Sequence, residues 1–224
     1  MINVFIVDDH ELVRNGVKKL LADINNIKVV GEACRGEDAI AYMRKDENKQ
    51  PDVILMDIQM PGIGGMEATR KILHINPDVK IIALTAYVGE PFPSRLLQAG
   101  AAGYLTKDCG AEEMIQAIRA VNSGQRYISP VVAQQLALKR FVPDEKSVLD
   151  VLSERELQVM LMITRGVKVQ DISTKLHLSA KTVNSYRYRL FEKLGVTTDV
   201  ELTHLAIRLG LIENLATPFG GEGV

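Results

Sequence analysis

The sequence predicts a doubly wound α/β domain on a five-stranded parallel sheet, followed by a small all-α domain of four helices. Five short β-branched apolar segments alternate with helical segments over residues 2–122, which is typical of parallel strands covered on both faces. Residues 148–214 contain no convincing strand. The chain has 224 residues, and a prior of about 150 residues per domain gives one or two domains.

The predicted strands share near-continuous apolar character. They are Asn3–Val7, Lys28–Ala33, Asp52–Met56, Lys80–Leu84 and Gly103–Leu105. The segments between them have apolar residues at helical spacing. In the first of these segments the apolar face comprises Leu12, Val13, Val17, Leu20 and Leu21. We therefore assign residues 1–122 to the first domain.

Residues 123–147 are predicted to be a linker. Gly124 and Pro130 interrupt the pattern, and Pro143–Ser147 has the composition of an exposed connection. A short helix over about Val131–Lys139 is compatible with the sequence. Residues 214–224 are predicted to be a mobile tail.

Helix signals define the second domain, residues 148–213. Ser153 and Glu156 form a capping box that opens a helix over about Glu154–Thr164. The helices that follow are predicted over Val169–Leu176, over Ala180–Leu194 after Ser179, and over about Val200–Leu209.

Composition excludes several classes of protein. Hydrophobic residues make up 46% and charged residues 25%, so the chain is not biased enough to be disordered. There is no apolar run long enough to span a membrane, and the N-terminus does not resemble a signal peptide. The two cysteines have no metal-site spacing. We expect a cytoplasmic protein with unpaired thiols and no membrane partner.

Polar side chains lie at the carboxyl ends of four predicted strands, where doubly wound sheets bind ligands. They are Asp8, Asp9, Asp57, Thr85, Thr106 and Lys107. The three carboxylates would repel one another, and a hard divalent cation would relieve this repulsion. We therefore expect Mg²⁺ (or Mn²⁺), held by the carboxylates and by the backbone carbonyl of Gln59.

This set of groups suits phosphoryl transfer. A carboxylate can form an acyl phosphate, and a metal ion with a lysine can neutralise the developing charge. Asp57 is the best nucleophile because it follows the central strand. Taken singly, each residue has a simpler explanation: Asp9 could cap the helix that begins near His10, and Lys107 could be solvated. The four scattered histidines are read as surface or packing residues rather than ligands.

The segments FIVDDH, ILMDIQMPGIGG, IIALTA and GYLTKD resemble the receiver domain of two-component response regulators, which has a flavodoxin-like fold. The resemblance implies that Asp57 accepts the phosphoryl group, that Asp8 and Asp9 hold the metal, and that Thr85 and Lys107 engage the phosphoryl group. It also implies that Tyr104 is the switch aromatic. The chain departs from many receivers in having Asp108 rather than proline after the lysine.

The formal net charge of the chain is −1, but the charges are unevenly distributed. Residues 165–193 contain seven basic and two acidic residues. Such a segment is typical of proteins that bind a phosphate backbone. Lys181, Arg187, Arg189 and Lys193 are predicted to contact phosphates. Thr182, Asn184, Ser185 and Tyr188 are predicted to address base edges in the major groove. A solvated amphipathic helix is the simpler alternative.

The segment LSERELQVMLMITRGVKVQDISTKLHLSAKTVNSYRYRLFEKLGV resembles the LuxR-type helix-turn-helix. The resemblance implies that Ala180–Leu194 is the recognition helix and that the last helix mediates dimerisation. The domain order is that of NarL/FixJ-family response regulators, and TVNSYRYRLFEKLGV and EPFPSRLLQAGAAGYLTKD are similar to their UvrY/GacA branch. The resemblance implies a sensor histidine kinase or phosphotransfer domain as donor, double-stranded DNA and RNA polymerase as partners, a homodimer when active, and small regulatory RNA genes as targets.

Two other classes of protein fit the sequence less well. An aspartyl-phosphate phosphohydrolase would need a second acid two residues after the acceptor, where Gln59 stands. A pure protein-interaction module would not need the basic face. We therefore expect no enzymatic turnover beyond self-phosphorylation and self-dephosphorylation. We also expect that activation frees the basic helix.

Overall fold

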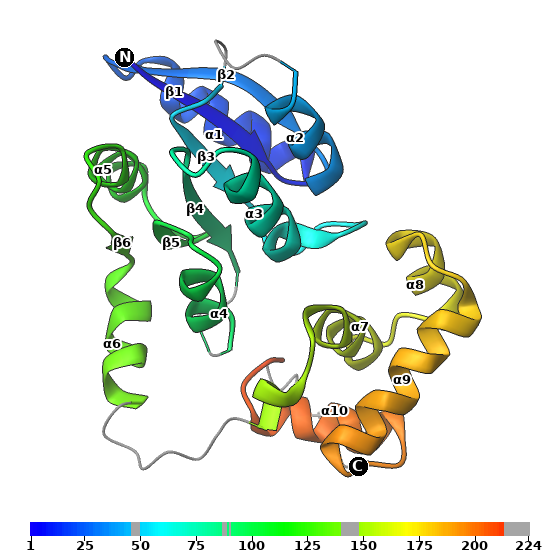
Figure 1. The fold of residues 1–224 in the computed structure, drawn as a ribbon. Helices are drawn as coiled ribbons and strands as arrows, with labels where there is room; N and C mark the ends of the chain where they lie inside the picture. Colours follow the sequence, from blue (N-terminus) through cyan, green and yellow to red (C-terminus); the bar gives the residue numbers. More distant parts are fainter. Residues whose placement is uncertain (46–49, 87–88, 90, 140–147, 213–224) are drawn as a thin grey trace, which may run out of the picture.

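The computed structural model describes residues 1–45, 50–86, 89, 91–139 and 148–212. It divides into two bodies (Figure 1): an α/β domain, and a helical domain that follows α6 (Pro130–Lys139) in the chain. The predicted fold class, a parallel α/β sheet domain followed by a helical domain, is confirmed. The predictions for Pro143–Ser147 and for the tail lie outside the described residues. No helix in the described part of the chain is long and apolar enough to cross a membrane.

The sheet is parallel throughout, with strand order β2-β1-β3-β4-β5-β6. Its strands are β1 (Ile2–Val7), β2 (Ile27–Ala33), β3 (Val53–Met56), β4 (Lys80–Thr85), β5 (Gly103–Thr106) and β6 (Tyr127–Ile128). The five predicted strands are all present. Each lies within one or two residues of its expected bounds.

The prediction of five strands was wrong by one. Tyr127–Ile128, assigned from sequence to the linker, adds a sixth strand beside β5. The amide of Tyr127 donates to the carbonyl of Ala102, and the amide of Ser129 donates to the carbonyl of Tyr104. The first part of the expected linker is therefore hydrogen-bonded to the receiver sheet.

Helices cover both faces of the sheet because successive strand residues point to opposite sides. α1 (Glu11–Ala22) and α5 (Ala111–Asn122) pack on one face, over residues such as Ile6 and Leu55. α2 (Gly36–Met43) and α3 (Gly64–Ile75) pack on the other face, over residues such as Val7 and Ile54. This double coverage explains the near-continuous apolar strands.

The helical domain begins with η2 (Val148–Val151). It continues through α7 (Glu154–Thr164), α8 (Val169–Leu176), α9 (Ala180–Leu194) and α10 (Asp199–Arg208). The predicted capping box of Ser153 and Glu156 is present, and Ser179 Oγ caps α9 by accepting from the amide of Thr182. The possible helix before this domain is α6 (Pro130–Lys139).

One apolar cluster spans both domains. Tyr104 of β5, together with Phe92 and Leu96 of α4 (Phe92–Gln98), belongs to the same buried group as Leu149 of η2 and Leu157 of α7. The receiver face that contains Tyr104 is thus continuous with the core of the helical domain.

Candidate functional site

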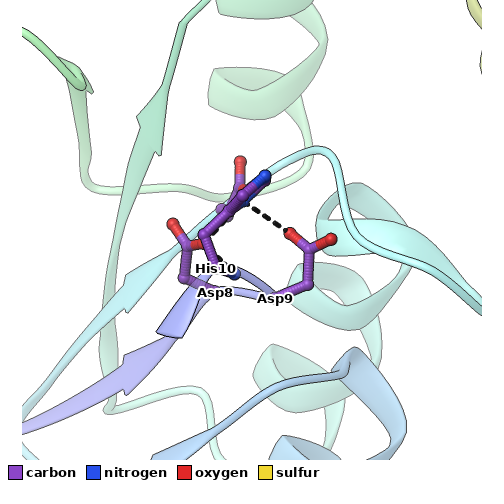
Figure 2. Close-up of side chains that lie close together, drawn as sticks. Asp8, Asp9 and His10 are labelled. Atoms are coloured by element: carbon purple, nitrogen blue, oxygen red, sulfur yellow. Dashed lines mark hydrogen bonds and ion pairs between the residues drawn. The ribbon is translucent and has the colours of Figure 1, made fainter. Parts of the chain in front are cut away.

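Backbone hydrogen bonds hold the acidic residues at neighbouring strand ends. The amide of Asp57 donates to the carbonyl of Val7 at 2.8 Å, and the amide of Asp8 donates to the carbonyl of Ala33 at 3.1 Å. Both bonds continue the parallel pairing beyond the strands. The predicted convergence of Asp8, Asp9 and Asp57 is therefore present, and Figure 2 shows Asp8 and Asp9 flanking the point where β1 ends.

Lys107 links two of the carboxylates. Its Nζ lies 2.7 Å from Oδ2 of Asp57 and 2.7 Å from Oδ2 of Asp8. Asp8 and Asp57 are almost fully buried, at 1% and 2% exposure. The amide of Gln59 donates to Oδ1 of Asp57 at 3.1 Å. A single lysine thus opposes a buried pair of acids.

Burial has the largest effect on the pKa of Asp57. Desolvation raises the pKa of Asp57 from 3.8 to about 6, although the charge of and hydrogen bond from Lys107 act in the opposite direction. For Lys107, burial alone would lower the pKa, but Asp57 and Asp8 raise it above its usual value. In the absence of a further cation, the ionised carboxylate of Asp57 is destabilised.

The donor set fits a hard divalent cation. Carboxylate oxygens of Asp8, Asp9 and Asp57, with a ring nitrogen of His10, lie within 4.8 Å of one another. Mg²⁺ prefers oxygen ligands and keeps several waters, which suits a site with one open side. The cluster is open to solvent at Asp9, whose side chain is 28% exposed. The Gln59 carbonyl remains a predicted ligand.

His10 belongs to the acidic cluster, which sequence reasoning did not expect. Its Nδ1 lies 3.2 Å from Oδ1 of Asp8 and 3.0 Å from Oδ1 of Asp9, as drawn in Figure 2. Oδ1 of Asp8 also accepts from the amide of His10, so Asp8 rather than Asp9 binds the backbone near the start of α1. The position of His10 directly after the acidic pair was the available signal.

Gly65 lets α3 begin directly against the acceptor loop. A Cβ at this residue would lie 1.9 Å from the backbone carbonyl oxygen of Asp57, and its amide donates to the carbonyl of Ile58 at 2.9 Å. No residue with a side chain fits there without displacement. The glycine-rich segment therefore serves as a close-packed turn beside Asp57.

The remaining predicted receiver residues also lie where the strand ends place them. Thr85 is 1% exposed at the end of β4, and its carbonyl accepts from the amide of Lys107 at 2.7 Å. Tyr104 is fully buried two residues before the end of β5. The predicted phosphoacceptor Asp57 and the predicted phosphoryl-binding residues Thr85 and Lys107 thus lie at one end of the sheet. The predicted switch residue Tyr104 is two residues from that end.

The predicted recognition helix presents a polar ridge. Tyr188 is 65% exposed, and Lys181, Ser185 and Arg189 are also exposed. Asn184 and Thr182 are half-buried beside this ridge. Val183 and Leu190 face inward and are fully buried. The two sides of α9 are therefore separated as the sequence predicted.

Two of the residues predicted to contact DNA form ion pairs within the helical domain. Arg187 forms a bidentate ion pair with Asp199, with N···O distances of 2.6 and 2.7 Å. Nζ of Lys193 lies 2.7 Å from Oε2 of the buried Glu156 and donates to the carbonyl of Val151 at 3.1 Å. Their charges are therefore partly neutralised within the domain.

The loop after Asp57 contacts the helical domain. From α7, Arg155 Nη1 donates to the Gly62 carbonyl at 2.5 Å, and Gln158 Nε2 donates to the Met60 carbonyl at 3.2 Å. Just beyond α7, Arg165 Nη1 donates to Gln59 Oε1 at 2.9 Å. Further contacts across the domain boundary are Gly62 with Lys175, Arg70 with Glu154, Arg95 with Leu149, and Arg35 with His177.

These contacts do not involve the predicted recognition helix. Within the described residues, the hydrogen bonds and ion pairs between the domains arise from η2, α7, α8 and the residues next to them. The polar ridge of α9 stays exposed. The basic segment 165–193 includes Arg165, but the sequence did not predict its contact with Gln59 of the α/β domain.

Two family descriptions match the chain. "Response regulator receiver domain" matches residues 4–119, and "Bacterial regulatory proteins, luxR family" matches residues 150–206. The chain is 58% identical over 214 residues to "Response regulator GacA" of Pseudomonas aeruginosa, covering 95% of this chain and 99% of that protein. It is 59% identical over 212 residues to "Response regulator UvrY" of Escherichia coli K12, covering 94% and 96%.

Solved structures give the same result. A structure of the Salmonella typhimurium RcsB response regulator, described in terms of conformational dynamism for DNA interaction, matches with TM-score 0.71 and 27% identity, covering 93% of this chain and 98% of that one. RcsB of Salmonella enterica serovar Typhimurium, bound to promoter rprA with the phosphomimetic BeF3−, matches with TM-score 0.65 and 27% identity, covering 91% and 98%.

Proposed function

The chain belongs to the two-component response regulators that join a receiver domain to a LuxR-type DNA-binding domain, and on that premise we propose that phosphorylation of Asp57 controls DNA binding by α9. The observation that supports this most directly is the bridge from Lys107 to both Asp57 and Asp8, at 2.7 Å each. Three strand ends contribute to this bridge, and each contributes a group suited to phosphoryl transfer.

Asp57 acts as the nucleophile in this proposal. One carboxylate oxygen attacks the phosphorus of a phosphohistidine on a sensor histidine kinase or phosphotransfer domain. The P–N bond breaks, and its electron pair returns to the imidazole. Lys107 moves its hydrogen bond from the carboxylate to a phosphoryl oxygen, and the Thr85 hydroxyl hydrogen-bonds to another. The chain turns over no other substrate.

Asp8, Asp9, Asp57 and the Gln59 carbonyl would hold Mg²⁺ or Mn²⁺. When bound, the cation neutralises charge on the carboxylates and on the incoming phosphoryl group. Burial raises the pKa of Asp57 to about 6, so its carboxylate is only about half ionised near pH 6 without a further cation, which supports a role for a bound cation.

The loop after Asp57 transmits the effect of phosphorylation to the helical domain. Residues 58–63 connect Asp57 to α3, and this loop accepts hydrogen bonds from Arg155, Gln158 and Arg165. Movement of Thr85 and Tyr104 toward the phosphoryl group alters the apolar cluster shared with η2 and α7. Moving the equilibrium from mostly inactive to mostly active takes about 5 kcal/mol of differential stabilisation.

The output is a DNA-bound homodimer that acts in the cytoplasm with RNA polymerase. The exposed ridge of α9 reads the major groove, and α10 pairs two copies. We also propose that the activated genes encode small regulatory RNAs, as the sequence resemblance to the UvrY/GacA branch implies.

Labelling with acetyl phosphate and Mg²⁺ tests the acceptor assignment. Wild type and Asp108→Asn, a matched change at an exposed acid next to Lys107, should be labelled equally. Asp57→Ala should show no labelling. Undiminished labelling of Asp57→Ala would place the acceptor elsewhere.

A further inference from the structure

The guanidinium of Arg187 is fixed between two side chains. Its Nε and Nη2 donate to Oδ1 and Oδ2 of Asp199 at 2.6 and 2.7 Å. The guanidinium carbon also lies 5.2 Å from the centre of the Phe191 ring. Only 29% of the Arg187 side chain is exposed, whereas Tyr188, the next residue, is 65% exposed. A bidentate pair of this kind sets direction as well as distance.

The position of Arg187 on the helix agrees with this arrangement. Lys181, Ser185 and Tyr188 are three or four residues apart and form one exposed ridge of α9. Arg187 is four residues after Val183, which is fully buried. Arg187 therefore lies at the border of the buried face, and its side chain extends toward the start of α10.

Helices α9 and α10 both pack against α7. In the described part of the chain, the hydrogen bonds and ion pairs recorded between side chains of α9 and α10 all belong to Arg187 and Asp199. Asp199 is the first residue of α10, where a negative charge also interacts favourably with the helix dipole. This ion pair thus connects α9, the predicted recognition helix, directly to α10, the helix predicted to mediate dimerisation.

We propose that Arg187 is a positioning residue, which fixes α10 relative to α9 and thereby sets the geometry with which two copies engage two half-sites. The inference rests on the proposed function, since it assumes that α9 binds DNA and that α10 pairs two copies. It replaces the sequence-based expectation that Arg187 contacts a phosphate.

The two roles predict opposite results for a pair of variants. Arg187→Gln removes a positive charge, and Asp199→Asn removes a negative one. If Arg187 acts by attracting DNA, the first variant weakens binding, while the second frees the arginine and strengthens binding. If the ion pair positions α10, both variants weaken binding to paired half-sites by the same factor.

The experiment uses the full-length chain and two duplexes. One is selected by the wild type from a random pool and contains two half-sites; the other is the same duplex with one half-site scrambled. On the two-site duplex, both variants should lose about tenfold in affinity, or about 1.4 kcal/mol. Asp199→Asn should bind the one-site duplex like wild type. The double variant should be no weaker than either single variant.

The salt dependence separates positioning from phosphate contact. Arg187→Gln should keep the wild-type slope of log K against log salt, whereas Arg189→Gln, a matched change on the exposed side of α9, should lower the slope by about one contact. A reduced slope for Arg187→Gln, or wild-type two-site binding by Asp199→Asn, would overturn the inference.

Exchanging the charges guards against a folding defect. Arg187→Asp combined with Asp199→Arg should recover at least part of the two-site affinity that Arg187→Asp alone loses, and absence of any recovery would overturn the inference. A wild type that shows no sequence preference on any duplex would refute the proposed function together with this inference. Normal wild-type binding with unequal effects of the two single variants would refute the inference alone.

Discussion

Asp57→Asn should make the metal-free protein more stable at neutral pH. The substitution keeps the shape of the side chain and removes a carboxylate whose ionised form is destabilised by burial. The pKa of Asp57 rises from 3.8 to about 6, and a rise of about two units corresponds to about 3 kcal/mol. This is the expected gain in the free energy of unfolding above pH 7.

The sign follows from proton binding. Between pH 3.8 and about 6, the folded chain holds a proton on Asp57 that the unfolded chain has released. The contribution of this group to the free energy of unfolding therefore falls as the pH rises through that window. The advantage of Asp57→Asn should be about 3 kcal/mol at pH 7.5 and about half of that at pH 5.

Urea unfolding in EDTA at these two pH values measures the effect. Asp108→Asn, at an exposed acid, should unfold like wild type at both. Adding Mg²⁺ should stabilise the wild type and leave Asp57→Asn nearly unchanged, because the variant lacks the charge that the cation neutralises. An Asp57→Asn variant no more stable than wild type at pH 7.5, or equally stabilised at pH 5, would refute this electrostatic account.

Three further predictions concern packing, docking and DNA recognition. Gly65→Ala should lower the free energy of unfolding by about 3 kcal/mol, measured by urea unfolding, because its Cβ would overlap the Asp57 carbonyl at 1.9 Å. Arg155→Ala should loosen domain docking by removing the contact to the Gly62 carbonyl, seen as a larger radius of gyration in small-angle scattering. Lys181→Ala should lower the salt slope on all duplexes by about one contact, while Asn184→Ala or Tyr188→Ala should reduce sequence preference more than non-specific affinity; selection from a random pool distinguishes these outcomes.

The position of the acidic cluster followed from the sequence because parallel strands fix where their ends lie. Once β1, β3, β4 and β5 were recognised as buried strands, Asp8, Asp57, Thr85 and Lys107 had to meet at one edge of the sheet. The sixth strand was missed because Tyr127–Ile128 is only two residues long, too short to show a periodic pattern. Its pairing depends on backbone groups, which every sequence has.

The partners of charged side chains were less predictable. A count of basic residues does not say which of them pair with acids, and here Arg187 and Lys193 form ion pairs with Asp199 and Glu156. The helical position of Arg187, four residues from a buried valine, was a usable signal. No sequence signal predicted the docking of α7 on the loop after Asp57, because two of the acceptors are the backbone carbonyls of Met60 and Gly62.

The most direct test of the account is the affinity of wild type and Asp57→Asn for the selected two-site duplex, with and without BeF3− and Mg²⁺. The account predicts that these additions tighten wild-type binding by about tenfold or more, within the usual range of coupling between sites, and leave Asp57→Asn unchanged. Equal responses of the two proteins, or no response of the wild type, would contradict it.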